Sequence, residues 1–170
     1  TALWHITQAM LRWMAPFLSF TAEEAWRVFG GERTIFVEHY WSLPQADEGL
    51  IAKWNRVHAV RDAVNKAIEA VRTEGGVGSS LQANVTVGAP AEDHAILASL
   101  GDDLKFVFIT SEAVLAAADE LTIQVTPSTA TKCERCWHWR TDVGSDPAHP
   151  TICGRCTSNL YGEGETRLVA

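Results

Sequence analysis

Residues 132–162, KCERCWHWRTDVGSDPAHPTICGRCTSNLYG, contain all four cysteines of the 170-residue chain, arranged as two CxxC pairs with sixteen residues between them. Two residues between cysteines allow a tight turn that directs both sulfurs toward one point, and two such turns complete a tetrahedron. This spacing is typical of a structural zinc site with four thiolate ligands. We therefore predict one structural zinc ion, with the ligands Cys133, Cys136, Cys153 and Cys156.

A metal also meets a physical need of this segment. About forty residues with few aliphatic side chains cannot build a sufficient hydrophobic core. Zinc binding at neutral pH contributes on the order of 10 kcal/mol toward folding. We expect the ion to replace the core here.

Other uses of four cysteines are weaker interpretations. A thioredoxin-like dithiol needs a CxxC that opens a helix within a strand–helix–strand setting, and neither pair shows that context. Four thiolates can also hold iron, whereas a catalytic zinc needs an open coordination position that they do not leave. His138 and His149 could each replace a cysteine, although ordinary polar loop residues are the simpler interpretation.

Function must then come from the side chains that the metal module displays. Arginines beside aromatic residues suit stacking on unpaired bases and pairing with phosphates. The alternative is that one or both tryptophans pack against the metal site or a neighbouring domain. The candidate RNA-binding residues of this segment are Arg135, Trp137, Trp139, Arg140 and Arg155.

The first part of the chain shows helical patterns. Apolar residues recur at helical spacing over 2–14, which predicts a helix that buries one apolar stripe. Thr21 and Glu24 fit a capping box for a short helix over about 22–29, and Gly30 with Gly31 supplies its end. The run RTIFVEHYW has β-branched and aromatic character, which predicts an extended segment.

The longest pattern runs from Asp47 to Thr73, where apolar residues fall on one stripe over about seven turns. Its basic side chains are interleaved with acidic ones, which is typical of a solvated helix face. The functional alternative is a phosphate-facing flank of a helical bundle. On that interpretation Arg56 and Lys66 are further candidates for RNA contacts.

The middle of the chain predicts a small α+β unit. EGGVGSS ends the long helix, and its glycines indicate a linker because a phosphate-binding loop would need a preceding strand and a GK[ST] end. We expect a strand from about residue 81, a helix over 92–100, and strands over 104–109 and 121–125. Such a βαββ unit is too small to stand alone, so it should pack against the long helix.

The fold class is therefore mostly α with a small α+β junction: part of a helical bundle, a βαββ unit and a four-cysteine zinc-ribbon or β-hairpin module. We assign residues 1–75 to the helical part, 76–128 to the α+β part and 129–170 to the zinc module, with a linker over 126–131.

Charge and hydropathy restrict the functional class. The formal net charge is −7, but residues 76–128 hold one basic and seven acidic side chains, and residues 129–170 hold five of each. The ends of the chain can therefore still face a phosphate backbone. No apolar run is long enough for a membrane span and the start lacks signal-peptide features, so we expect a cytoplasmic protein without a membrane partner.

The residues quoted above, with three further stretches, resemble one family. KCERCWHWRTDVG and ICGRCTSNLYGEGETR are similar to the C-terminal zinc module of bacterial isoleucyl-tRNA synthetases. MLRWMAPFLSFTAEEAW resembles the anticodon-binding helical domain of class I synthetases, and GGVGSSLQANVTV and LKFVFITSEA resemble the junction that follows it. The likeness covers nearly the whole chain in the right order.

This resemblance implies a parent enzyme that attaches isoleucine to its tRNA with ATP. The HIGH and KMSKS signatures of the catalytic core are absent from this sequence, so ATP and isoleucine would bind only in a missing catalytic domain. The chain, which does not begin with methionine, would be a fragment that grips the anticodon stem and loop. The parent would be a monomer.

Two alternatives stay open. Formamidopyrimidine-DNA glycosylases end in a zinc finger with similar cysteine spacing, which suggests a DNA-binding fragment of a repair enzyme. A zinc ribbon that binds only protein would use its tryptophans as an interface. The helical sequences upstream favour the synthetase.

Overall fold

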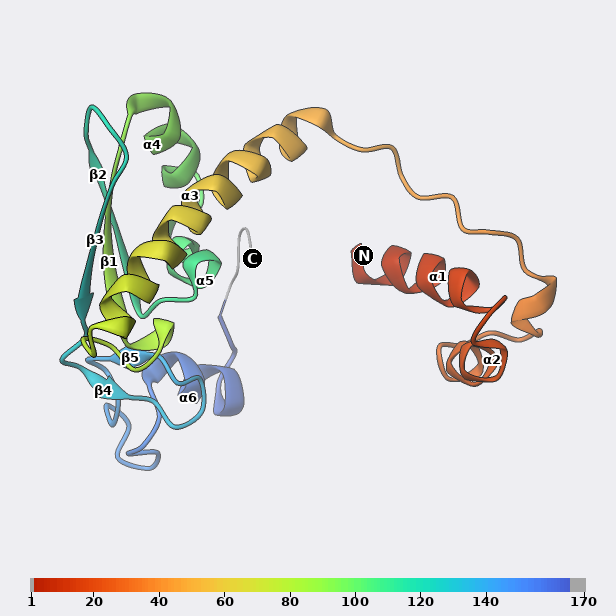
Figure 1. Cartoon of the computed structure of the whole chain (residues 1–170). Coiled ribbons are helices and arrows are strands. Elements are labelled where there is room, and N and C mark those ends of the chain that lie inside the picture. The colour runs from red at the N-terminus through yellow and green to blue at the C-terminus, as the bar shows by residue number, and fades with distance from the viewer. Residues whose placement is uncertain (1, 166–170) are drawn as a thin grey trace. The chain divides into compact units, whose positions relative to one another are not determined.

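The computed structural model describes residues 2–165 and divides the chain into two compact units, residues 1–47 and 48–170 (Figure 1). The first unit contains α1 (Ala2–Met14), α2 (Ser19–Val28) and the 3-10 turn η1 (Ile35–Val37). The second contains the long helix, the sheet and the cysteine segment. No helix among the described residues is both long and apolar enough to cross a bilayer.

The first unit packs around a small apolar cluster that joins its helices to η1: Leu11, Ala15, Ala22, Trp26 and Ile35. Beside this cluster the Arg12 guanidinium lies 4.5 Å from the ring centre of Trp26 and 5.4 Å from that of Trp41. It also donates to Glu38 Oε2 at 3.1 Å. Arg12 therefore ties α1 to the segment after η1 through stacking and an ion pair.

Helix α1 has the predicted bounds, but the prediction of its buried face is wrong. Within the first unit the apolar stripe is largely exposed, including Leu3, Ile6 and Met10. The buried side is that of Ala9, Leu11 and Arg12 because α2 and η1 pack there. In this unit the stripe is an uncovered apolar surface.

Helix α2 starts earlier than predicted, at Ser19, so the capping box is wrong. Thr21 lies inside the helix, and the N-cap residue Leu18 offers no side-chain hydrogen bond. Gly30 adopts φ +102°, a left-handed conformation that favours glycine, and it ends the helix as expected.

The extended segment predicted over RTIFVEHYW is found only in part, because Thr34 and Glu38 have extended backbone but the residues between them form a 3-10 turn, and the run pairs with no strand among the described residues. Its centre is η1, whose Ile35 is buried and donates its backbone N–H to Glu23 Oε2 at 2.8 Å. The Glu23 carboxylate on α2 thus satisfies one backbone N–H that a strand partner would otherwise take.

The second unit is built on the long helix α3 (Glu48–Thr73), which confirms that prediction. Its buried residues, Val57, Val60, Val64 and Ile68, share one face and join a core with the sheet. The sheet has the order β2-β1-β3, with β1 (Ala83–Ala89) parallel to β2 (Glu112–Ala117) and antiparallel to β3 (Thr122–Pro127). Helix α3 packs on this sheet, as the small size of the βαββ unit led us to expect.

Helix α4 (Ala91–Ala98) confirms the helix predicted after the first strand. The strand predicted over 104–109 is wrong, because this segment follows the turn η3 (Gly101–Asp103) as a short helix, α5 (Leu104–Phe108). Leu104 and Phe108, four residues apart, are both buried in the core, as neighbours on one helix face are. The parallel partner of β1 is instead β2.

An ion pair fastens α4 to α3. Asp93 is buried and accepts two hydrogen bonds from the guanidinium of Arg56, one of them at 2.6 Å to Oδ2. The Arg56 hydrogen bonds hold the pKa of Asp93 below its ordinary value of 3.8, although burial acts in the opposite direction. Because the pKa of Asp93 is depressed in the fold, its stabilising effect is present above pH 3.8 and is lost as the pH falls through the folded value.

We therefore expect Asp93→Asn to lower stability at pH 7 and to flatten the loss of stability below pH 3.8. The measurement is the urea concentration at the midpoint of unfolding, followed by the amide signals of the sheet, between pH 7 and pH 3 for wild type and variant. Glu92→Gln, which changes the exposed neighbouring carboxylate, is the matched control. Parallel pH profiles for wild type and Asp93→Asn would contradict the linkage.

The last part of the second unit is the cysteine module. It contains a two-stranded hairpin, β4 (Thr131–Lys132) paired with β5 (Trp139–Arg140), and a helix, α6 (Gly154–Tyr161). The fold is thus mostly α with a small α+β unit and a four-cysteine module, as predicted. Residues 126 and 127 belong to β3 and Thr131 to β4, so the linker is shorter than expected. The division at residues 75 and 128 stays a prediction.

Candidate metal centre and nucleic-acid surface

The four cysteine sulfurs converge on one point of the module. All four lie within 4.8 Å of one another, and Cys133–Cys156 and Cys136–Cys153 are each 3.8 Å apart. A zinc ion with Zn–S bonds of about 2.3 Å in a tetrahedron requires sulfurs about 3.8 Å apart. The donor set therefore fits zinc, and three of its members are fully buried: Cys133, Cys153 and Cys156.

The local backbone explains why the sulfurs converge. We call the two CxxC turns, residues 133–136 and 153–156, the first and second knuckles. In the first knuckle, Trp137 donates its N–H to Cys133 O at 2.9 Å and adopts φ +66°. In the second, Cys153 is the N-cap of α6, and its N–H points to Cys133 Sγ at 3.4 Å. The second pair thus opens a helix, but no strand follows α6 among the described residues, so the strand–helix–strand setting of a thioredoxin-like dithiol is not found there. Its two sulfurs face the sulfurs of the first pair.

Burial and backbone hydrogen bonds act in opposite directions on the cysteine thiols of the cluster. Burial opposes ionisation of Cys133, yet backbone N–H groups of Cys136, Cys153 and Arg135 together lower its pKa to about 6. Burial raises the pKa of Cys136 to about 12. Arg135 also directs Nη1 toward Cys156 Sγ at 3.6 Å. Four thiolates with Zn²⁺ carry a charge of −2, and this guanidinium offsets part of it.

Neither histidine of the module belongs to the sulfur cluster. His138 packs edge-on against Phe106, with ring centres 5.5 Å apart, and its Nδ1 lies 3.1 Å from Cys136 O. Burial lowers the pKa of His138. His149 stacks on Tyr161 with ring centres 3.9 Å apart. Both histidines have packing roles in this structure.

The candidate RNA-binding residues divide into two groups. Arg135, Trp137 and Lys66 are exposed, and Trp137 shows 60% of its surface. Lys132, which the sequence reasoning missed, lies with its ammonium 5.8 Å from the centre of the Trp137 ring. Its position before the first cysteine on the same hairpin was the available signal. We call Lys132, Arg135 and Trp137 the knuckle surface.

The second group consists of arginines that pair with carboxylates of the same chain. Arg140 pairs with Asp142 at 2.9 Å and holds the pKa of that carboxyl below its ordinary value. Arg155 pairs with Glu165 and lies 4.7 Å from the ring centre of Phe106. Arg56 is the partner of Asp93 in the ion pair between α3 and α4. These three side chains have structural partners in the fold.

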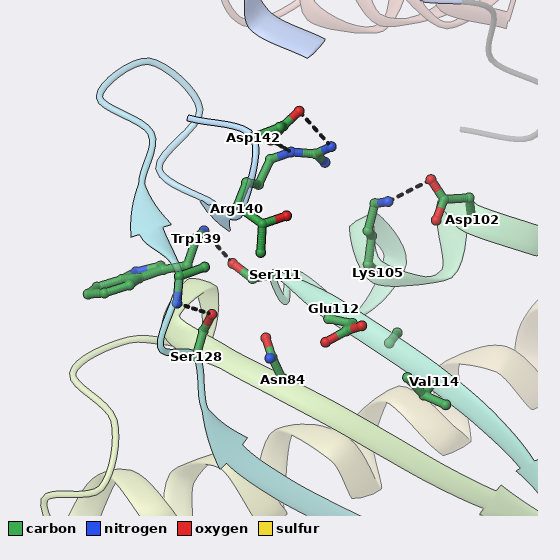
Figure 2. Close-up of a pocket in the computed structure, with 13 residues that line it drawn as sticks. Asn84, Asp102, Lys105, Ser111, Glu112, Val114, Ser128, Trp139, Arg140 and Asp142 are labelled. Atoms are coloured by element: carbon green, nitrogen blue, oxygen red, sulfur yellow. Dashed lines mark hydrogen bonds and ion pairs between the residues drawn. The ribbon is translucent and has the colours of Figure 1, made fainter. Parts of the chain in front are cut away.

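Trp139 differs from Trp137 because it is half-buried. It lines a cavity of about 310 Å³ between the sheet and the hairpin, together with Ser111, Lys105 and Arg140 (Figure 2). In this view its indole extends away from Ser111 and Lys105. Trp139 is therefore less exposed than Trp137, and its packing against the metal site or the neighbouring domain stays a prediction.

Comparisons with known proteins match both parts of the chain. Residues 1–87 match the family model described as the anticodon-binding domain of tRNA ligase. Residues 131–159 match a zinc finger found in FPG and IleRS.

Curated relatives are similar over nearly the full chain. An isoleucine–tRNA ligase of Ralstonia pickettii is 59% identical over 99% of this chain, and one of Cupriavidus necator is 57% identical over 99%. One of Bordetella petrii is 56% identical over 98%. In each case the aligned part is 19% of the relative, so this chain spans about a fifth of the length of the relatives it matches.

Proposed function

The chain belongs to the family of anticodon-binding domains of tRNA ligases, and we propose that it binds the anticodon stem and loop of an isoleucine tRNA. The observation that carries the proposal is the knuckle surface, where an exposed indole, a lysine and an arginine surround the metal site. An aromatic face with adjacent cations stacks on an unpaired base and pairs with its phosphates. The 59% identity to an isoleucine–tRNA ligase supports isoleucine as the cognate amino acid.

In the proposed parent, this chain contributes binding rather than chemistry. The parent is a ligase that uses ATP to attach isoleucine to tRNA, and ATP and isoleucine bind outside this chain. Zinc, held by the four cysteines, is a structural ion that fixes the first knuckle. The parent functions as a cytoplasmic monomer.

We rank the proposed contacts by exposure and by whether the side chain already has a carboxylate partner. Arg135, Trp137 and Lys66 keep their place as tRNA contacts, and Lys132 joins them because of its position over Trp137. Arg56, Arg140 and Arg155 are ranked lower because each already has a carboxylate partner. A tRNA phosphate would have to compete with that partner for each guanidinium.

Trp137→Gly tests the proposed surface with little disturbance of the metal site. Glycine adopts the left-handed conformation of residue 137 without strain, whereas alanine would not. Stacking of one base contributes about 1–3 kcal/mol, so the affinity for isoleucine tRNA should fall roughly 5- to 150-fold. The measurement is fluorescence anisotropy of labelled tRNA, with zinc content determined on the same samples.

Tyr161→Ala is the matched control, since Tyr161 is another large exposed aromatic residue of the module and stacks on His149. A duplex DNA with one damaged base is the competing ligand in the same assay. An unchanged tRNA affinity in Trp137→Gly would exclude the stacking role. Tighter binding of the damaged duplex than of tRNA would favour the repair-enzyme alternative.

A further inference from the structure

The hairpin that carries the knuckle surface is not hydrogen-bonded into the main sheet of the described residues. Strands β4 and β5 form a separate two-stranded sheet. Yet the backbone N–H of Trp139, on β5, donates to Ser111 Oγ at 2.6 Å (Figure 2). Ser111 immediately precedes β2, so its hydroxyl connects the hairpin to the α+β unit.

Ser111 is itself firmly held. Its hydroxyl donates to Leu81 O at 2.5 Å and its N–H donates to Ala83 O at 3.0 Å. The residue is 7% exposed. A hydroxyl that donates to one backbone and accepts from another has a defined direction, so it transmits the position of the sheet to the hairpin.

The turn before Ser111 fixes this position. Ile109 ends α5 with φ 57° and ψ 48°, a left-handed conformation that is rare for a β-branched residue. Thr110 then donates its N–H to Lys105 O at 2.9 Å and is fully buried. The same turn of chain presents Phe106, which contacts His138 and Arg155 of the module. The segment from α5 to Ser111 therefore supports the cysteine module through these contacts.

From Ser111 the contacts lead directly to the exposed residues. Trp139 is the register partner of Lys132 across the hairpin. Lys132 lies over the ring of Trp137, and Cys133 donates its N–H to His138 O at 2.9 Å. The position that Ser111 gives to Trp139 is therefore passed across the hairpin to Lys132, and from Lys132 to the ring of Trp137.

We propose that Ser111 is a positioning residue for tRNA recognition: its hydroxyl holds β5 so that Lys132 and Trp137 face the RNA in one fixed orientation. This inference rests on the proposed function. A pre-oriented surface binds more tightly because less conformational freedom is lost on association. Ser111 itself touches no RNA in this proposal.

The variants Ser111→Ala, Ser111→Thr and Ser128→Ala separate positioning from folding. Ser128 is the matched control, because it is a buried serine that lines the same cavity and its Oγ accepts from the nearby Ala130 N–H at 3.4 Å, a contact within its own turn. Ser111→Thr keeps the hydroxyl and should restore what Ser111→Ala loses. The readouts are zinc content, hydrogen exchange of the Trp139 amide, and affinity for isoleucine tRNA.

With Ser111→Ala we expect one zinc per chain, exchange of the Trp139 amide roughly tenfold faster, and tRNA affinity about 2- to 10-fold weaker, the range of one net hydrogen bond. In a Lys132→Ala/Trp137→Gly background the same change should have almost no further effect on tRNA affinity, because its influence passes through these two side chains. Ser128→Ala should match wild type.

An unchanged tRNA affinity in Ser111→Ala would overturn the inference, and so would an equal loss in the Lys132→Ala/Trp137→Gly background, which signals general destabilisation. If the wild-type chain does not bind isoleucine tRNA, the proposed function fails. The exchange rate of the Trp139 amide then still decides whether Ser111 holds the hairpin.

Discussion

Replacing one cysteine of each pair, in Cys133→Ser with Cys153→Ser, should unfold the cysteine module while the α+β core keeps its structure. Both residues are fully buried and neither belongs to the core around α3 and the sheet. The module's own apolar contacts, from Val143 and Ile152, are only partly buried. Without the roughly 10 kcal/mol that zinc contributes, so small a cluster should not hold the knuckles or α6.

The measurement combines elemental analysis with backbone amide spectra. Wild type should contain one equivalent of zinc, and the double variant almost none. Signals from residues 131–162 should collapse to unfolded positions, whereas those of Val85, Val87 and Phe108 in the core should stay in place. Ser145→Ala, an exposed position of the connecting loop, is the control and should change neither result.

Chelation of the wild-type protein should reproduce the spectrum of the double variant. A metal-free double variant that kept its module signals would contradict a structural role for the ion. An equivalent of iron instead of zinc would keep the structural argument and change the metal.

The sequence was most informative where one pattern had one physical solution. The CxxC spacing led to the four sulfurs that the structure brings together, since such turns leave few other arrangements. The amphipathic stripe of α3 was equally decisive over its length. The family resemblance, drawn from the cysteine segment and the upstream helices, is confirmed by the family models and the curated relatives.

Local patterns failed where tertiary contacts decided the structure. Residues 104–109 have strand composition, but burial of Leu104 and Phe108 on one face makes them a helix. The strand Glu112–Ala117 was missed because its alanines give little β signal, and its pairing with β1 depends on residues nearly thirty positions away. The capping box at Thr21 failed because α2 begins two residues before it.

For the candidate site, the sequence identified the residue types but not their partners. Trp137 and Trp139 look equivalent in KCERCWHWR, yet one is exposed and the other half-buried. Arg135 and Arg140 also look equivalent, yet Arg140 pairs with the carboxylate of Asp142 while Arg135 points at a cysteine sulfur. Exposure and pairing depend on how the hairpin sits on α5 and Ser111, which no local pattern encodes.

The second large effect that we expect is a dependence of binding on the anticodon itself. The chain carries a net charge of −7, so its long-range field does not favour a polyanion. Phosphate contacts alone would give weak binding without sequence preference. If the knuckle surface and the helical part grip the anticodon loop, most of the affinity must come from stacking on its unpaired bases and from contacts with their edges.

The most direct test of this account is a competition between isoleucine tRNA and the same tRNA with only its anticodon triplet replaced, measured with the zinc-loaded chain. Each base contact of this kind contributes about 1–3 kcal/mol, so we predict that the replaced tRNA binds at least roughly tenfold more weakly. Equal affinities for the two tRNAs would contradict the account, because the chain would then bind only the sugar–phosphate backbone of the RNA.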